Sequence, residues 1–232
     1  VAASVPEVTY APLGGVASVS PAAVDTIVDA LAGYDVLLLG PGISQDDGVR
    51  EAVADLLTRL PESVRACVID ADGLNALATW DAWQERVERA LVLTPHPGEM
   101  SRLLGRDVPS IQDDRLGAAL SAATDWNQVV VLKGAHTIVA APAGRAAISP
   151  HATSLLATAG TGDVLAGAIA GFIAQGMAPF EAAACGVFVH GAAAEEVGDG
   201  LGDRGLVASD LLPALPRAIR TVREGKLRGG PS

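Results

Sequence analysis

The stretch 156–163, Leu-Ala-Thr-Ala-Gly-Thr-Gly-Asp, contains the residues best suited to binding and transferring a phosphoryl group. Gly160 and Gly162 carry no Cβ, so the backbone can adopt a positive φ and an anion can approach its N–H groups. The helix expected to follow adds unpaired amides and the positive end of its dipole. We therefore expect Gly160, Thr161 and Gly162 to form an anion site, for which phosphate is the usual occupant.

Asp163 lies at the rim of this expected anion site. A carboxylate beside a phosphate repels it, so the residue needs a role that offsets the repulsion. The obvious role is a general base for a hydroxyl that attacks the phosphoryl group. The alternative is an ordinary cap at the start of a helix, worth about 1 kcal/mol. The motif alone leaves both interpretations open.

Other small or polar clusters follow apolar runs that are typical of parallel strands buried on both faces. The first, Gly40-Pro41-Gly42, ends the run 35–40. Because open α/β sheets bind ligands at the carboxyl ends of their strands, we expect Gly42 to contact a ligand. The alternative is an ordinary turn from a strand into a helix.

The second cluster, Asp-Ala-Asp-Gly-Leu-Asn at 70–75, ends the run 65–70. Two acids two residues apart could aim one side chain at a site and the other at the structure. Asp72 and Asn75 are weaker site candidates, because either residue could instead cap a short helix over 74–80.

The third cluster follows the run 90–94 and contains Pro95, His96, Pro97 and Glu99. His96 can hydrogen-bond a ligand. Glu99 is expected in the first turn of a helix, where it could hold a Mg²⁺-bound water. The alternative for Glu99 is an acid favoured there by the helix dipole.

The fourth cluster follows the run 128–133 and comprises Lys133, Gly134, Ala135, His136 and Thr137. A lysine and a threonine hydroxyl around a glycine turn can hold a phosphate. We expect the Lys133 side chain at the solvent edge; it could also simply be solvated there. The segments 137–141 and 145–149 are expected to pair as antiparallel strands around a turn at 142–144.

Helices are expected between and after these strands, because apolar residues recur with helical spacing there. The expected ranges are 21–32, 47–60, 74–80, 83–89, 100–104, 110–124, 164–173, 179–197 and 208–223. The alternation of buried strands with helices indicates an α/β fold, a doubly wound, mostly parallel sheet flanked by helices. We expect one domain over 1–223 and a flexible tail over 224–232.

The composition supports a single sizeable core, because the chain has 232 residues and 50% of them are hydrophobic. The net charge of −11 argues against nonspecific binding to nucleic acid or to anionic membranes. Cys67 and Cys185 lie far apart without metal-ligand spacing, so we expect buried free thiols. We see no signal peptide or membrane-spanning pattern and expect a cytoplasmic protein.

Taken together and in this order, the clusters resemble the ribokinase-like superfamily and, within it, the ADP-dependent NAD(P)H-hydrate dehydratase family. The resemblance covers about residues 35–196, and the combination is specific, although Gly-Thr-Gly-Asp alone occurs in many kinases of the superfamily. The family usually begins with a further strand, a glycine-rich turn and a helix before a segment that resembles residues 1–10. We expect that unit to be missing here and the chain as written to have low activity by itself.

The resemblance implies a repair lyase that acts on the 6-hydroxy hydrate of NADH or NADPH (NADHX or NADPHX). ADP would phosphorylate the hydroxyl, and phosphate would then leave, giving the reduced cofactor and AMP. The general base would be Asp163, which would also contact the hydrate together with Gly42 and His96. The adenine nucleotide would be bound by Lys133, Gly134, Ala135, His136, Thr137, Gly160, Thr161 and Gly162.

Mg²⁺ is expected with the nucleotide, with Glu99 as a weak candidate that acts through water, and the resemblance implies a homo-oligomer, a tetramer. Two rival hypotheses remain at this point. One is a kinase of a vitamin-precursor alcohol, which would release a stable phosphorylated product. The other is a nucleotide-binding protein without catalysis. The pKa of Asp163 is also open, because the helix dipole should lower it and neighbouring phosphate should raise it.

Overall fold

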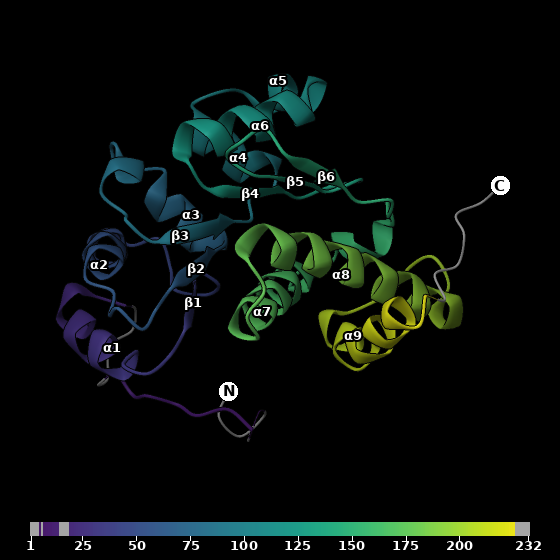
Figure 1. The fold of residues 1–232 in the computed structure, drawn as a ribbon, viewed down its shortest axis with the longest axis horizontal. Helices are drawn as coiled ribbons and strands as arrows, with labels where there is room; N and C mark the ends of the chain where they lie inside the picture. Colours follow the sequence, from purple (N-terminus) through teal and green to yellow (C-terminus); the bar gives the residue numbers. More distant parts are fainter. Residues whose placement is uncertain (1–4, 6, 14–18, 226–232) are drawn as a thin grey trace.

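In the computed structural model, residues 5, 7–13 and 19–225 are described, and a six-stranded sheet forms the centre of the molecule (Figure 1). The strands lie side by side in the order of the sequence. The first four strands run parallel to one another, the fifth runs antiparallel to the fourth, and the sixth runs antiparallel to the fifth. This confirms the predicted mostly parallel sheet and the predicted antiparallel pair. The strands are β1 Val36–Leu39, β2 Ala66–Ile69, β3 Ala90–Leu93, β4 Val129–Leu132, β5 Ile138–Ala140 and β6 Ala146–Ile148.

Helices cover both faces of this sheet (Figure 1). One apolar core joins the sheet to the helices that connect its strands, and a second joins the opposite face to two helices that follow the sheet in sequence. The helices before and between the strands are η1 Pro21–Ala23, α1 Val24–Ala30, α2 Asp47–Thr58, α3 Ala71–Leu77, η2 Trp83–Glu85, α4 Pro97–Leu104, α5 Val108–Asp113 and α6 Arg115–Trp126. The later helices are η3 Ser154–Ala157, α7 Thr161–Ala174, α8 Pro179–Leu201 and α9 Ala208–Arg223, of which α9 packs on α8 around a third core.

Several helix predictions need correction. The helix expected over 74–80 begins at Ala71 and ends at Leu77, so Asp70 is its cap position. The helix expected over 110–124 is two helices, α5 and α6, because Asp114 leaves the helical conformation at ψ 72° and its carboxylate accepts a hydrogen bond from the Gly117 amide. The predicted piece over 83–89 is one short turn, η2. The predicted tail lies almost wholly outside the described residues.

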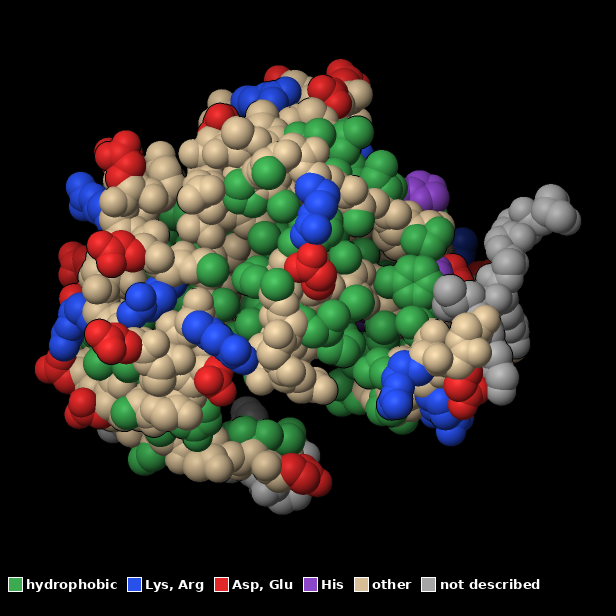
Figure 2. Space-filling view, viewed as in Figure 1, with side chains coloured by type: hydrophobic (Ala, Val, Ile, Leu, Met, Phe, Trp, Pro, Cys, Tyr) green, Lys and Arg blue, Asp and Glu red, His purple; other side chains and the backbone are tan. Residues whose placement is uncertain are grey.

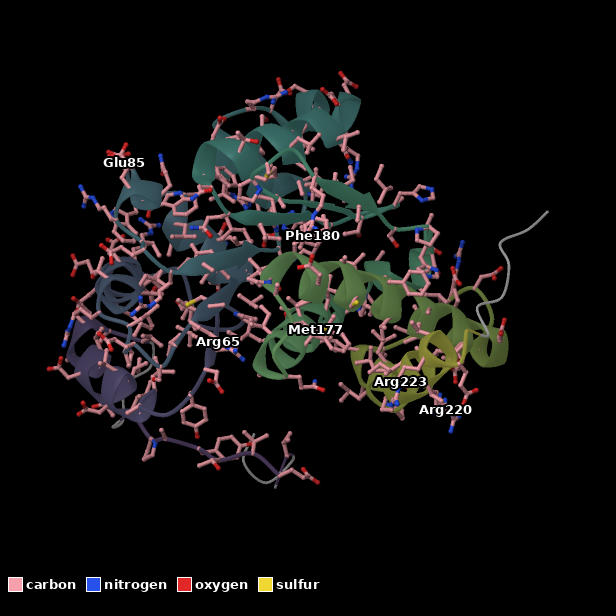
Figure 3. All side chains as sticks on the ribbon, viewed as in Figure 1. Arg65, Glu85, Met177, Phe180, Arg220 and Arg223 are labelled. Carbon is pink, nitrogen blue, oxygen red and sulfur yellow. The ribbon has the colours of Figure 1, made fainter. Side chains whose placement is uncertain are left out.

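The second helical layer is attached to the sheet by a side chain that precedes β2. The guanidinium of Arg65 donates hydrogen bonds to the carbonyls of Ile173 and Ala174, which are the last carbonyls of α7 (Figure 3). This satisfies carbonyls that a helix end leaves without partners. Apolar side chains gather on the outer face over α7 and α8 (Figure 2). No helix among the described residues has both the length and the apolar character needed to cross a membrane.

Both cysteines are free thiols, as expected, but only Cys67 is buried, and burial raises its pKa to about 12. Cys185 is half-buried. Neither thiol therefore takes part in a described disulfide.

The strand register brings the ends of the strands to one edge of the sheet. Leu39 pairs with Ile69, and Ile69 pairs with Leu93. The hydrogen bonding continues one residue beyond the strands, because the amide of Asp70 donates to Leu39 and that of Thr94 donates to Ile69. The residues that follow β1, β2 and β3 therefore lie next to one another.

Two glycines allow the start of α3 to approach the end of β1. Gly40 has φ +133°, and a Cβ there would lie 1.7 Å from the carbonyl oxygen of Asp70. A Cβ on Gly73 would lie 2.8 Å from the carbonyl oxygen of Leu39. Both contacts are with backbone, which cannot swing aside as a long side chain can. The backbone of Asp70 is therefore held by a close contact that only glycines permit.

We predict that Gly40→Ala lowers the free energy of unfolding by about 3 kcal/mol or more, because it adds a backbone clash to an unfavourable φ. Gly33→Ala is the matched control, since Gly33 has φ +87° but open space around its missing Cβ. The control should lose about 1 kcal/mol. Chemical denaturation of the two variants measures the difference, and equal losses would show that the contact with Asp70 does not constrain the fold.

Candidate active site

A cavity of about 620 Å³ opens at the carboxyl edge of the sheet, between the ends of β2 and β4, the start of α4, the start of α7 and the middle of α8. Its volume is in the range of small-molecule sites. Most of the residues expected at the site line it. They are His96, Glu99, Lys133, Gly134, Ala135, Thr137, Gly160, Thr161, Gly162 and Asp163.

The centre of the charged end is an ion pair between Lys133 and Asp70. The Nζ atom of Lys133 lies 2.6 Å from Oδ1 of Asp70 and 3.7 Å from Oε2 of Glu99. Asp70 is 1% exposed, and the Lys133 side chain is 19% exposed. The expectation that Lys133 lies at the solvent edge is therefore wrong: Asp70 holds the ammonium inside the cavity, where the side chain is largely buried.

The two acids of the second cluster serve different purposes, as the sequence suggested. Asp70 faces the cavity, whereas Asp72 accepts hydrogen bonds from the Ser44 amide and the Gln45 side chain. Ala71 separates them with φ +48°, an unusual conformation for a residue with a side chain. Asn75 accepts a hydrogen bond from Arg102. Asp72 and Asn75 thus shape the neighbouring loop and helix, and neither lines the cavity.

His96 and Glu99 form a reciprocal cap at the start of α4. The Nδ1 atom of His96 accepts hydrogen bonds from the amides of Gly98, at 2.9 Å, and Glu99, at 3.3 Å. Oε2 of Glu99 accepts the His96 amide at 2.8 Å. In the neutral ring the proton is then on Nε2, because Nδ1 acts as the acceptor. The cap fixes a half-exposed imidazole at the cavity, with Nε2 at a long 3.5 Å from Oε1 of Glu99.

The same contacts limit how far the Glu99 carboxylate is available to bind a metal ion. Oε2 already accepts the His96 amide and faces the Lys133 ammonium, which would compete with a cation. Among residues 5, 7–13 and 19–225, no group of three or more His, Cys, Asp and Glu side chains is arranged to hold a metal ion. These donors do not fit a magnesium site held by protein side chains alone.

The turn predicted to bind an anion lies at the start of α7. Gly160 has φ +85°, and α7 begins at Thr161. The Thr161 hydroxyl donates to the carbonyls of Leu156 and Thr158, so it stabilises the turn and is not free for a ligand. The first amides of a helix have no partner within it, which leaves those of Gly162 and Asp163 for an anion. A Cβ on Gly162 would lie 3.5 Å from Nζ of Lys133, so the ammonium adjoins this turn.

The pKa of Asp163 is raised above the ordinary value of an aspartate. Desolvation by its partial burial is the largest cause, repulsion from Asp70 adds to it, and Lys133 opposes it. The side chain is exposed, but it is exposed into a concave site with another carboxylate close by. The protein environment thus raises the basicity of Asp163 even without a phosphate beside it.

Two expected site residues do not line the cavity. Gly42 lies in the turn after β1 with φ +73°. His136 has φ +52°; its amide donates to the carbonyl of His151, and its Nδ1 atom lies 3.1 Å from the carbonyl oxygen of Ser149. His136 therefore joins the turn after β4 to the segment after β6.

Sequence reasoning missed three titratable residues that line the cavity: Asp70, His151 and His190. His190 is buried on α8, and burial lowers its pKa to about 4, so its ring is neutral at neutral pH. Only Asp70 had a sequence signal for a place in the site, because it ends an apolar run. Asp72, two residues later, was an equally plausible candidate. His151 and His190 belong to no recognisable motif.

We predict that Lys133→Met lowers the free energy of unfolding by about 3 kcal/mol, because it leaves the Asp70 carboxylate buried without its partner. Arg50→Met is the matched control: Arg50 pairs with Asp47 at 3.1 Å, but the two side chains are 45% and 94% exposed. The control should cost less than about 1 kcal/mol. Urea denaturation measures both, and a small loss for Lys133→Met would show that the pair is screened by water.

Residues 2–217 match the protein family described as NAD(P)H-hydrate dehydratase. A relative from Moorella thermoacetica, named bifunctional NAD(P)H-hydrate repair enzyme Nnr, is 46% identical over 87% of this chain and 38% of its own length. One from Neisseria meningitidis, named ADP-dependent (S)-NAD(P)H-hydrate dehydratase, is 39% identical over 76% of this chain and 60% of its own length. The chain spans 37–42% of three bifunctional relatives.

Among solved structures, the chain is similar to the ADP/ATP-dependent NAD(P)H-hydrate dehydratase of Bacillus subtilis, co-crystallized with ATP and Mg²⁺ and soaked with CoA. The two are 31% identical with a TM-score of 0.76, and the match covers 94% of this chain and 75% of the other. The similarity thus extends over nearly the whole chain in both sequence and fold.

Proposed function

The chain belongs to the NAD(P)H-hydrate dehydratase family, and we propose that it removes water from hydrated NADH or NADPH at the expense of ADP, giving the reduced cofactor, AMP and phosphate. The observation that carries this proposal is the position of Asp163, on the first turn of α7 beside free helix amides and next to the Asp70–Lys133 pair. The printed names of the relatives support the reaction and the nucleotide.

In the proposed first step, Asp163 takes the proton of the hydrate's C6 hydroxyl as its oxygen attacks the β-phosphorus of ADP. The bond from that phosphorus to the bridging oxygen breaks, and AMP leaves with the electron pair. The amides of Gly162 and Asp163 face the charge that develops on the transferring group. The raised pKa of Asp163 suits this role, because a carboxylate of ordinary pKa is a weaker base.

In the second step, the phosphorylated hydroxyl departs as phosphate, a far better leaving group than hydroxide. The lone pair of the ring nitrogen supports the breaking of the C6–O bond, and loss of a proton from C5 restores the ring double bond. His96 lines the same cavity with a fixed ring and can donate a hydrogen bond from Nε2 to the hydrate. The contact proposed for Gly42 remains a prediction.

The Lys133 ammonium is placed to offset negative charge on the nucleotide phosphates, since it adjoins the turn at Gly162. The B. subtilis structure was obtained with ATP and Mg²⁺, which supports a magnesium nucleotide as the substrate form. Because the protein side chains do not form a magnesium site by themselves, we propose that the nucleotide phosphates supply the main ligands of the ion. The homotetramer remains a prediction from the resemblance, and the cytoplasmic location remains a prediction from the sequence.

We predict that Asp163→Asn lowers kcat about 10²–10⁴-fold while ADP still binds, because the amide cannot accept the hydroxyl proton. Asp72→Asn removes a carboxylate outside the cavity and should keep nearly full turnover. The assay incubates NADHX with ADP and Mg²⁺ and follows the return of absorbance at the NADH band. Phosphate and AMP are measured in the same samples. Near-normal kcat in Asp163→Asn would refute its role as base. A stable phosphorylated hydrate without phosphate release would identify a kinase instead.

The raised pKa of Asp163 predicts a pH dependence. Activity requires the deprotonated carboxylate, so kcat should fall as the pH falls through that raised pKa. Asp70→Asn removes the repulsion from Asp70 and leaves Lys133 free to interact with Asp163, and both changes lower the pKa of Asp163. The acidic limb of the kcat–pH profile should therefore move to lower pH. A limb that stays in place or moves upward would show that Asp163 does not control it.

A further inference from the structure

The wall of the cavity carries more negative than positive side chains. Asp70, Glu99 and Asp163 contribute carboxylates to it. Among the lysines and arginines of the described residues, Lys133 is the one that lines it, and its ammonium is already paired with Asp70 at 2.6 Å. Repulsion from the carboxylates would weaken the binding of a polyanion such as ADP unless positive charge close to the wall offsets it.

Arg115, the first residue of α6, brings a guanidinium to the turn that follows β4. Its Nη2 atom donates hydrogen bonds to the carbonyl of Leu132, at 3.2 Å, and to that of Lys133, at 3.3 Å. Its Nη1 atom donates to Oε1 of Gln112 at 2.9 Å. Three contacts thus hold the guanidinium in one place.

Gly134 allows this guanidinium to lie directly behind the cavity wall. Gly134 lines the cavity, whereas Arg115 does not. The glycine has φ +143°, and a Cβ on it would lie 3.0 Å from both terminal nitrogens of Arg115. The guanidinium therefore lies against a residue of the wall without facing the cavity itself.

The charge of Arg115 is not neutralised by the contacts that hold it. All three hydrogen-bond partners are uncharged oxygens. Partial burial lowers the pKa of the guanidinium, and no carboxylate of the described residues counters that effect. The side chain nevertheless stays charged in a protein. The first turn of a helix is also an unfavourable place for a cation, because it is the positive end of the dipole. The fold thus keeps an uncompensated positive charge beside the cavity.

We propose that Arg115 supplies the positive charge that the cavity wall lacks, and that it acts through the turn at Gly134 to strengthen the binding of a nucleoside diphosphate. Arg115 is then a positioning residue, which acts on ligand affinity from behind the wall and takes no part in the chemistry at Asp163. The inference rests on the proposed function, because it requires ADP in this cavity.

The test measures the Kd of ADP by calorimetry and the kinetic constants of the NADHX assay, with Mg²⁺ present throughout. Arg115→Met removes the charge, so it should raise the Kd and KM of ADP about tenfold while kcat at saturating ADP stays within about twofold. Arg115→Lys keeps the charge but cannot span both carbonyls, and it should recover most of the lost affinity.

Arg65→Met is the matched control. Arg65 makes the same kind of contact, from one guanidinium nitrogen to two successive carbonyls, but it does so at the end of α7 and does not line the cavity. Both methionine variants should lose some stability, because each removes hydrogen bonds to carbonyls. Arg65→Met should leave the Kd of ADP unchanged.

An unchanged Kd in Arg115→Met would overturn the inference and leave the proposed function intact, whereas a wild-type chain that does not bind ADP would overturn both. Equal weakening by Arg115→Met and Arg115→Lys, or a kcat that falls together with the affinity, would show that Arg115 only supports the turn. If Arg115→Met does not fold, Arg115→Gln, which keeps an amide donor for the carbonyls, replaces it with the same expected result. Failure of both variants to fold would show that the guanidinium serves the fold, and would also overturn the inference.

Discussion

The ion pair between Asp70 and Lys133 is the interaction on which the arrangement of the site depends. Moving two charges out of water is unfavourable, and their attraction offsets that cost only at short distance, here 2.6 Å. The pair also acts on its neighbour: desolvation is the main cause of the raised pKa of Asp163, repulsion from Asp70 adds to it, and Lys133 opposes it. A carboxylate of raised pKa binds a proton more readily, which is what a general base requires. The ion pair thus links the stability of the carboxyl edge of the sheet to the pKa of Asp163 on α7.

The position of Asp70 follows from backbone contacts more than from its own side chain. The shared register of β1, β2 and β3 aligns the ends of these strands, and the contact between Gly40 and the Asp70 carbonyl fixes where α3 can begin. Ala71 then turns the chain through a left-handed conformation, so that Asp70 faces the cavity and Asp72 faces the loop after β1. A small change at a glycine remote from the chemistry would therefore displace a charge that the site requires.

The sequence predicted the strands and the anion turn because their signals are local: apolar runs mark the strands, and Gly-Thr-Gly-Asp marks the turn before α7. It could not identify the partner of Lys133, because Asp70 is 63 residues away and only the strand register brings the two together. It could not tell which of two nearby acids faces the site, since that depends on one left-handed residue. The break in the predicted helix over 110–124 depends on how Asp114 caps α6, and no periodicity shows this.

Helix α8 packs closely against its neighbours at two positions that lack a side chain. A Cβ on Gly186 would lie 2.6 Å from Ile169 of α7, so this glycine allows the helix that carries Asp163 to pack closely against α8. A Cβ on Gly191 would meet the His151 ring at 2.5 Å, so the second glycine positions the imidazole. The two glycines are separated by about 7.5 Å along the helix axis. One rigid helix therefore holds both the helix that carries Asp163 and the His151 ring at the wall of the cavity.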